Sequence, residues 1–374
     1  MNKIKVMSIF GTRPEAIKMA PVVKELEKYQ EIESIVCVTA QHRQMLDQVL
    51  ELFDIKPQYD LNIMQPGQTL SEITARVLTG LEEVIKKEKP HMVLVHGDTT
   101  TTFAGALAAF YQQVKVGHVE AGLRSYNMYS PYPEEINRML TGRLTTLHFA
   151  PTKGNKSNLL AEGIAEEKII LTGNTVIDAL LKVVKKDYQF PEERLNHIDY
   201  DGKKIISMTA HRRENLGQPM INIFTAVKEL VEKNHDTEVI FPVHLNPKVR
   251  EAAYEILGST KGIHLIEPLD YEPFANLMAK SYLILTDSGG IQEEAPALGK
   301  PVLVLRTETE RPEAVDAGTV KMAGIEKERI FHMADTLLND KKEYDAMANA
   351  VNPYGDGKAS ERIVKAILDH FGNL

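Results

Sequence analysis

The chain has 374 residues, of which 43% are hydrophobic and 26% charged, and its formal net charge is −8. This length exceeds what one hydrophobic core usually supports and fits two domains, while the negative charge argues against nucleic acid or an anionic membrane as partner. The single cysteine, Cys37, excludes a disulfide framework, and the sequence shows neither a Cys/His metal spacing nor a run of ~18 apolar residues. We therefore expect a soluble, cytoplasmic protein that could still bind a small anion.

The first half of the chain alternates between short apolar runs and helical periodicity. Residues 3–10 are strand-like and break at Gly11, after which helical spacing begins with Pro14 in its first turn. A strand, a glycine turn and a helix present backbone N–H groups to an anion. Arg13 and Lys18 lie close to that helix start, where they either contact an anion or are ordinary surface charges. Further strands are expected at 34–39, 92–95, 114–119, 147–150 and 169–172. This alternation is typical of a parallel, doubly wound sheet.

Three acids stand near the ends of these elements. Asp98 and Glu120 follow the apolar runs 92–95 and 114–119, and Glu134 opens a helix after a proline-flanked loop. Ligands of open parallel sheets bind outside the carboxyl ends of the strands. Each acid alone could be a helix cap or a solvated loop residue, but the three together indicate a reaction site.

A second βα series begins after a charged stretch within residues 176–199. Its strand at 204–208 leads to His211 and Arg212, and its strand at 239–243 ends at His244. The junction therefore separates two α/β halves, each with polar residues at strand ends.

The strand at 282–286 runs into Ser288, Gly289 and Gly290 and then directly into a helix. Paired glycines at such a turn allow a phosphate to approach the backbone amides. Glu294 lies one turn into the helix, within reach of a ribose, and Arg311 after the next strand could neutralise phosphate. The alternative is a packing turn followed by solvated glutamates.

We expect two Rossmann-like domains of the glycosyltransferase-B type, with a cleft between them that closes over a nucleotide-sugar. Residues 1–175 form the N-terminal domain with the acids, and residues 176–359 form the nucleotide-binding domain. The helix at 360–374 follows a glycine-rich break and is expected to pack back on the first domain.

Seven motifs along the chain resemble one family. They read FGTRPEAIKMAP, HGDTTTT, GHVEAGLRS, PYPEEINR, TAHRREN, LTDSGGIQEEAP and ERPEA. In this order they resemble the non-hydrolysing UDP-N-acetylglucosamine 2-epimerases of bacteria. The resemblance implies interconversion of UDP-N-acetylglucosamine and UDP-N-acetylmannosamine through elimination and re-addition of UDP, without NAD or metal. It also implies a homodimer that supplies N-acetylmannosamine for cell-wall or capsular polysaccharide.

The resemblance also assigns roles to individual residues. Acid and base chemistry at C2 falls on Asp98, Glu120 and Glu134, and His211 contacts the phosphates. UDP binding falls on Arg13, Lys18, Phe274, Ser288, Gly289, Gly290, Glu294 and Arg311. A second UDP-N-acetylglucosamine site, through which the substrate activates turnover, falls on Gln41, Gln44, Glu134, Arg212 and His244. Relatives carry a basic residue where this chain has Pro66-Gly67, which predicts weaker regulation.

Three other functions stay open on the same fold. A hydrolysing epimerase would let water capture the glycal, and a glycosyltransferase would need an acceptor, for which the chain has no obvious insertion. A non-catalytic nucleotide-sugar sensor would not need all three acids.

Overall fold

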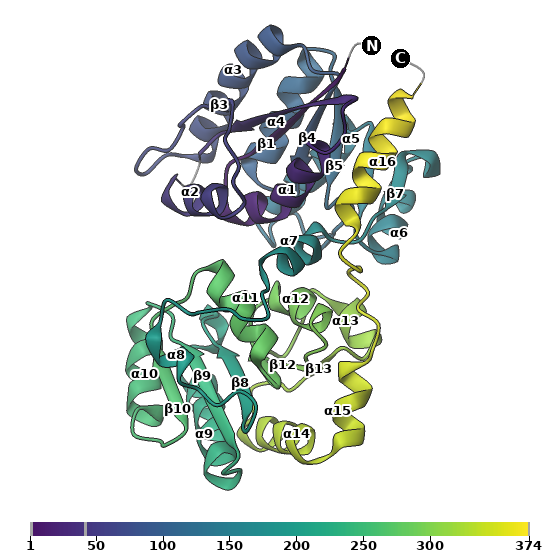
Figure 1. Ribbon diagram of the computed structural model, residues 1–374. Helices are drawn as coiled ribbons and strands as arrows, with labels where there is room; N and C mark the ends of the chain where they lie inside the picture. Colours follow the sequence, from purple (N-terminus) through teal and green to yellow (C-terminus); the bar gives the residue numbers. More distant parts are fainter. Residues whose placement is uncertain (1–2, 41–42, 373–374) are drawn as a thin grey trace. The chain divides into compact units, whose positions relative to one another are not determined.

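The computed structural model describes residues 3–40 and 43–372, which form two compact units. Unit 1 comprises Met1–Ala179 and Tyr354–Leu374, and unit 2 comprises Leu180–Pro353 (Figure 1). The chain thus leaves unit 1 once and returns to it near its end. In the described ranges, the helices are too short or too polar to cross a bilayer.

Unit 1 is built on a parallel sheet in the order β3-β2-β1-β4-β5-β6-β7. Its strands are β1 Ile4–Phe10, β2 Ile32–Val38, β3 Tyr59–Asp60, β4 Met92–His96, β5 Lys115–Val119, β6 Leu147–Ala150 and β7 Ile169–Leu171. The expected strands of this half are all present, and among the residues that the structure describes only the two-residue β3 is additional. Strand order reverses between β1 and β4, which is where ligands of doubly wound sheets bind.

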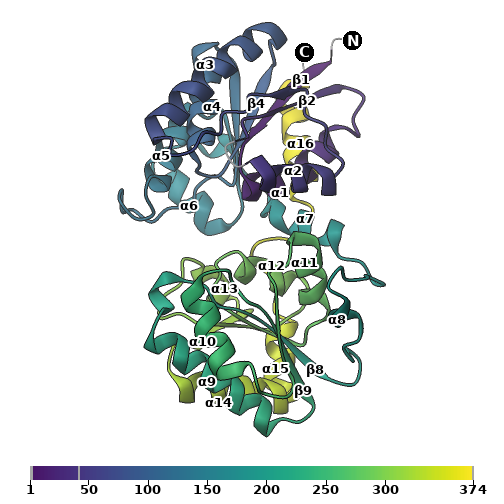
Figure 2. The ribbon, with the colours of Figure 1, turned by 90° about the vertical axis from the view of Figure 1, so that its left-hand side faces the viewer.

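The helices of unit 1 cover both faces of this sheet (Figure 2). They are α1 Arg13–Leu26, α2 Arg43–Leu52, α3 Leu70–Glu88, α4 Thr100–Tyr111, α5 Glu134–Leu144, α6 Lys153–Ala161 and α16 Ala359–Phe371, with a 3-10 turn at Glu166–Lys168. Helices α3 and α4 share a core with β1 and β4, and α16 lies beside α1 in both views.

Local sequence explains why these helices form. Helix α3 begins with a capping box between Thr69 and Glu72, which satisfies two otherwise free N–H groups. Its buried residues Ile73, Val77 and Leu81 recur every four positions and therefore face the sheet. This spacing forms the apolar face of the helix.

Helix α7, Thr175–Val183, follows β7 and holds the returning end of the chain. Asp178 is buried, and its carboxylate accepts hydrogen bonds from the backbone N–H groups of Ala359 (3.1 Å) and Ser360 (2.7 Å). These are free donors of the first turn of α16, where a carboxylate is favourable. The N-terminus of α16 is thus fastened to α7.

Unit 2 repeats the design with a parallel sheet in the order β10-β9-β8-β11-β12-β13. Its strands are β8 Lys204–Thr209, β9 Thr237–Pro242, β10 Ile263–Ile266, β11 Leu283–Thr286, β12 Val302–Val304 and β13 Val320–Met322. The order reverses between β8 and β11, so the switch point of unit 2 lies beside the residues that follow these two strands.

The helices of unit 2 pack on this sheet around a second core that includes Phe224 and Phe241. They are α8 Glu193–Asn196, α9 Gln218–Lys233, α10 Pro247–Leu257, α11 Tyr271–Lys280, α12 Ile291–Ala297, α13 Pro312–Asp316, α14 Lys327–Asn339 and α15 Lys341–Ala348, with a 3-10 turn at Arg213–Asn215. Cys37, by contrast, lies buried in β2 of unit 1, where burial raises the pKa of its thiol to about 12. The thiol is part of the core of unit 1.

Candidate functional site

Glu120 lies directly after β5 at the carboxyl edge of the unit 1 sheet. Its φ of 63° is left-handed, a conformation that costs a non-glycine residue about 1–3 kcal/mol and is characteristic of functional sites. Lys18 of α1 forms an ion pair with Glu120 Oε2, and Asn174 Nδ2 donates to the same oxygen at 3.0 Å. Burial alone would raise the pKa of Glu120, but the charge of Lys18, followed by contacts with His96, holds that pKa well below its usual value.

Asp98 lies two residues past the end of β4 and is held by an arginine from α5. Arg138 donates to Asp98 Oδ2 from Nε (2.9 Å) and Nη2 (2.6 Å), and it also donates to Glu135 at 3.1 Å. Burial would raise the pKa of Glu135, but N–H groups of Ser125 and Tyr126, followed by Arg138, lower it. Arg138 thereby joins the end of β4 to the start of α5.

Glu134 is the first residue of α5, next to Glu135. Its Oε2 is buried and accepts no hydrogen bond from the residues that the structure describes. The preceding loop carries Tyr129 and Tyr132, whose rings stack at 6.4 Å and are 72% and 63% exposed. Glu134 therefore follows a loop that carries exposed aromatic rings and holds a buried carboxylate oxygen without a hydrogen bond from the described residues.

The start of α1 contributes the predicted anion-contact residues. Arg13 is the first helical residue and is half-buried, whereas Lys18 lies one turn later and reaches Glu120. Glu15 accepts hydrogen bonds from Gly11 N (3.0 Å), Thr12 N (2.8 Å) and Thr99 Oγ1 (2.6 Å). This buried carboxylate ties the turn after β1 to the cap of α4, across the switch point.

Asp287, directly after β11, organises the carboxyl edge of the unit 2 sheet. Its side chain is fully buried, and Oδ2 accepts from the backbone N–H groups of His211 and Arg212, both at 2.8 Å, and from Asn215 Nδ2 at 3.2 Å. His211 Nδ1 lies 3.1 Å from Asp287 Oδ1. Burial would raise the pKa of Asp287, but the contacts with His211 and Arg212 lower it.

His211 and His244 form a stacked pair at the same edge. Their ring centroids are 5.4 Å apart with an interplanar angle of 17°. Burial, followed by the nearby His211, lowers the pKa of His244. Because Nδ1 of His211 faces Asp287 Oδ1, Nε2 is the ring nitrogen left for a ligand among the described contacts.

The Ser288–Gly290 turn joins β11 to α12. A side chain added to Gly290 would meet no atom within 4 Å, so the turn is open at that point. Arg311 forms an ion pair with the buried Glu293. The carboxylate of Glu293 therefore offsets part of the positive charge of Arg311, which was predicted to neutralise a phosphate. Tyr271 OH donates to Glu294 at 3.2 Å. Phe274 is partly buried against a small core below this edge.

The residues assigned to the second ligand site fall into both units. Arg212 and His244 lie with His211 at the edge of unit 2, while Gln44 is exposed on α2 of unit 1. Gln41 lies outside the described residues. Pro66-Gly67 forms an exposed turn in which Gly67 has a φ of 70°.

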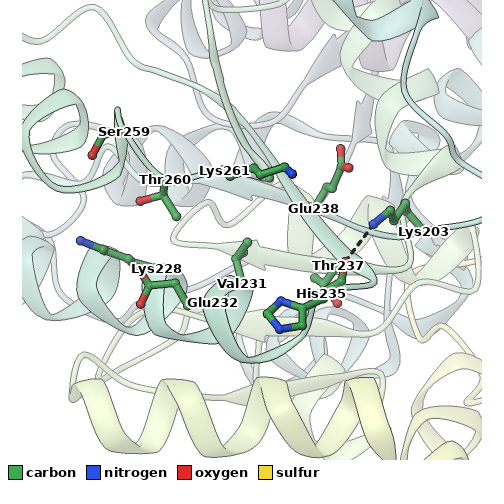
Figure 3. Close-up of a pocket in the computed structure, with 11 residues that line it drawn as sticks. Lys203, Lys228, Val231, Glu232, His235, Thr237, Glu238, Ser259, Thr260 and Lys261 are labelled. Carbon is green, nitrogen blue, oxygen red and sulfur yellow. Dashed lines mark hydrogen bonds between the residues drawn. The ribbon is translucent and has the colours of Figure 1, made fainter.

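One cavity of unit 2, of about 570 Å³, lies at the opposite edge of the sheet (Figure 3). It is bounded by residues at the starts of β9 and β10, and Lys203 Nζ donates to His235 O there at 2.8 Å. The predicted unit 2 residues are not among those lining it. A second cavity, of about 340 Å³, lies between α9 and α10.

Sequence reasoning missed the partners that hold the predicted residues. Arg138 was the last residue of a quoted motif and Asp287 preceded the glycine pair, yet neither was given a role. His96 and Asn174 had no local signal, because each meets Glu120 only through the fold.

Comparison with known proteins gives a consistent result. A family model described as UDP-N-acetylglucosamine 2-epimerase matches residues 24–368. The UDP-N-acetylglucosamine 2-epimerase of Bacillus subtilis is 60% identical over 372 residues, covering 100% of this chain and 97% of its own. A structure of UDP-GlcNAc 2-epimerase from Neisseria meningitidis bound to UDP-GlcNAc is 55% identical, with a TM-score of 0.86, covering 98% of this chain and 100% of its own.

A structure of the UDP-GlcNAc 2-epimerase from Methanocaldococcus jannaschii, in complex with UDP-GlcNAc and UDP, is 39% identical with a TM-score of 0.76. It covers 98% of this chain and 99% of its own. The two parallel sheets and these neighbours confirm the predicted α/β fold of the glycosyltransferase-B type, and the resemblance seen in the motifs is confirmed over the whole chain.

Proposed function

Because the chain belongs to the UDP-N-acetylglucosamine 2-epimerase family, we propose that it reversibly interconverts UDP-N-acetylglucosamine and UDP-N-acetylmannosamine without net hydrolysis. The product would supply N-acetylmannosamine units for cell-wall or capsular polysaccharide. The observation that carries this proposal is the carboxyl edge of unit 1, where Asp98 and Glu120 follow neighbouring strands and Glu134 opens α5.

The proposed reaction needs a base and an acid at C2. A carboxylate takes the C2 proton while the C1–O bond breaks, its electron pair leaves with UDP, and a C1=C2 double bond forms. In the second step a phosphate oxygen of UDP re-adds to C1, and an acid delivers a proton to the opposite face of C2. Glu120 suits the base, since Lys18 lowers its pKa and keeps it ionised. Asp98 and Glu134 are the candidates for returning the proton.

We assign the binding of the departing UDP to residues of unit 2. His211 offers Nε2, a fixed donor or acceptor beside the open Ser288–Gly290 turn, and preorganised groups of this kind stabilise developing charge without reorganising. This division places proton chemistry on unit 1 and phosphate binding on unit 2.

One assay separates the proposal from its alternatives. The purified protein is incubated with UDP-N-acetylglucosamine alone in D₂O and followed by proton NMR. We expect UDP-N-acetylmannosamine with deuterium at C2. Free N-acetylmannosamine would identify a hydrolysing enzyme, and turnover only after an acceptor is added would identify a transferase. Unlabelled UDP-N-acetylmannosamine would refute proton exchange with solvent.

The same substrate is proposed to activate turnover from a second site that includes Arg212 and His244. Arg212 and His244 both neighbour His211, so a ligand bound to them would influence the position of the His211 ring. In the reverse direction, UDP-N-acetylmannosamine alone should show a lag that a trace of UDP-N-acetylglucosamine removes. A wild-type progress curve without this lag would contradict activation.

A homodimer is proposed through the outer face of α4 and α5, which pack against each other. Phe110, Tyr111, Met139 and Leu140 are 55%, 60%, 39% and 44% exposed there. Exposed large apolar side chains on two helices that pack together favour an interface. Light scattering after chromatography should give twice the chain mass of 41.9 kDa, and Tyr111→Glu should reduce it; a monomeric wild type would exclude this state.

A further inference from the structure

His96, the last residue of β4, is a buried histidine with an unusual environment. Its residue is 3% exposed, and neither ring nitrogen makes a hydrogen bond with the described residues. Its backbone carbonyl accepts from Thr102 Oγ1 at the start of α4, which fixes where the side chain begins. A buried polar ring without hydrogen bonds is costly, so its presence calls for an explanation.

The nearest polar atom belongs to Glu120. His96 Nε2 lies 3.6 Å from Glu120 Oε2, because β4 and β5 pair in parallel with His96 opposite Val119, the residue before Glu120. The charged and titratable groups around the ring are Glu120 after β5, Lys18 from α1 and His118 within β5. His118 is itself held at 2.7 Å by the carbonyl of Gly97, and burial lowers its pKa to about 3.

All contacts of Glu120 converge on one of its two oxygens. Lys18, Asn174 and His96 approach Oε2, whereas no described residue bonds Oε1. Oε1 faces the Gly97 turn, where a side chain on that glycine would come within 3.7 Å of it. A carboxylate held on one oxygen presents the other in a fixed direction, as a general base must be placed.

Building on the proposed function, we propose that His96 is a positioning residue: its imidazole holds Glu120 through Oε2 so that Oε1 is aimed at the C2 proton. His96 does not touch the substrate and acts only through Glu120. A proton on Nε2 faces Oε2 across 3.6 Å, and a small approach of the ring makes it the third donor to that oxygen, beside Lys18 and Asn174, which favours the ionised carboxylate that the reaction requires.

The test replaces the ring without removing its volume. His96→Phe keeps an aromatic side chain but loses the donor, so we expect kcat to fall about 10- to 100-fold, the factor for a lost hydrogen bond to a charged group. KM should stay within about twofold, because the ring does not touch the substrate. The acidic limb of the kcat profile, which reports ionisation of Glu120, should move to higher pH. His96→Gln, whose amide can reach the same position, should recover much of the loss.

His148 provides the matched control. It is a fully buried histidine on β6 of the same sheet, and its ring nitrogens likewise lack hydrogen bonds in the described part of the chain, but no carboxylate contacts it. His148→Phe should leave kcat and the pH profile unchanged. Equal profiles for the two Phe variants would overturn the proposal and reduce His96 to a packing residue.

A second readout does not depend on turnover. Carbon-13 labelling of glutamate side chains allows the Glu120 carboxyl to be titrated by NMR, with Glu120→Gln identifying its signal. Its midpoint should rise in His96→Phe and stay fixed in His148→Phe. A wild type that does not epimerise would defeat the proposed function yet leave this result interpretable, whereas an unmoved midpoint would defeat the role of His96 alone.

Discussion

Replacing Asp287 by asparagine should weaken unit 2 specifically. The buried carboxylate accepts two backbone N–H groups, those of His211 and Arg212, both at 2.8 Å, and one from Asn215 at 3.2 Å. A hydrogen bond to a charged group contributes about 1.5–3 kcal/mol, against about 0.5–1.5 kcal/mol for a neutral one. Asn215 also donates to Leu305 O, so the loss of stability in Asp287→Asn comes mainly from the two backbone hydrogen bonds. We expect a loss of about 2 kcal/mol in the free energy of unfolding.

The pH dependence of this loss has a definite sign. The pKa of Asp287 is lowered in the folded protein, although burial opposes this, by its contacts with His211 and Arg212. Its charge therefore stabilises the fold above the unfolded pKa of about 4, and this contribution disappears as pH falls through the folded pKa. The difference in the free energy of unfolding between wild type and Asp287→Asn should be constant near neutrality and shrink below about pH 4.

The assay must report unit 2 by itself, because a chain of two units need not unfold in one step. Hydrogen exchange of peptides from β8 and β11, followed against urea, meets this need. Asp236→Asn is the control: this acid is 54% exposed and pairs with Lys204 at 2.8 Å, and such pairs contribute at most about 1 kcal/mol. Equal losses for the two variants, or a gap that grows in acid, would refute the reasoning.

Three further predictions concern unit 1. Glu120→Gln should lower kcat about 10²- to 10⁴-fold, measured by coupled assay of UDP-sugar turnover, because the amide cannot accept the C2 proton. Gly122→Ala should cost at least about 1–3 kcal/mol in urea unfolding, because φ is +92° and the new Cβ would lie 2.3 Å from Asn155 O. Asp178→Ala should speed hydrogen exchange in the first turn of α16 about tenfold, since two N–H groups lose their carboxylate.

Each of these has a matched comparison. Glu166→Gln removes an exposed acid that pairs with Lys156, and it should not change kcat. Gly163→Ala tests positive φ without a clash, since φ is +80° with no atom within 4 Å, so it should cost less than Gly122→Ala. For Asp178→Ala, unchanged exchange at the start of α16 would show that the carboxylate does not hold the helix.

Much of the fold follows from local sequence because the signals are short-range. Apolar runs such as 92–95 and 114–119 are buried strands, and the four-residue spacing of Ile73, Val77 and Leu81 is a helix face. Strand β3 was not predicted, because a strand of two residues is too short to show an alternation of apolar and polar side chains. The assigned acids could be placed at strand ends or a helix start for the same reason: their position depends only on where neighbouring elements stop or begin.

The partners of those acids could not be predicted, because they come from distant parts of the chain. Asn174 reaches Glu120 across 54 positions, and Arg138 reaches Asp98 across 40. Which of several nearby cations and amides meets a given carboxylate depends on side-chain direction and packing, and a pattern of residue types does not contain either. Lys18 illustrates the limit: the sequence indicated an anion contact, and in the structure the anion it meets is Glu120.

Strand pairing explains why both units join an acid to a histidine. In unit 1, β4 and β5 are parallel neighbours, so His96 at the end of one meets Glu120 after the other. In unit 2, β8 and β11 are parallel neighbours with Thr209 opposite Thr286, so the residues just beyond them, His211 and Asp287, also meet. The atom left open differs: among the described contacts, the acid of unit 1 keeps one oxygen without a hydrogen bond, and the histidine of unit 2 keeps one ring nitrogen without a hydrogen bond. The same sheet geometry thus leaves a carboxylate oxygen open in one unit and an imidazole nitrogen open in the other, as the proposed roles of Glu120 and His211 require.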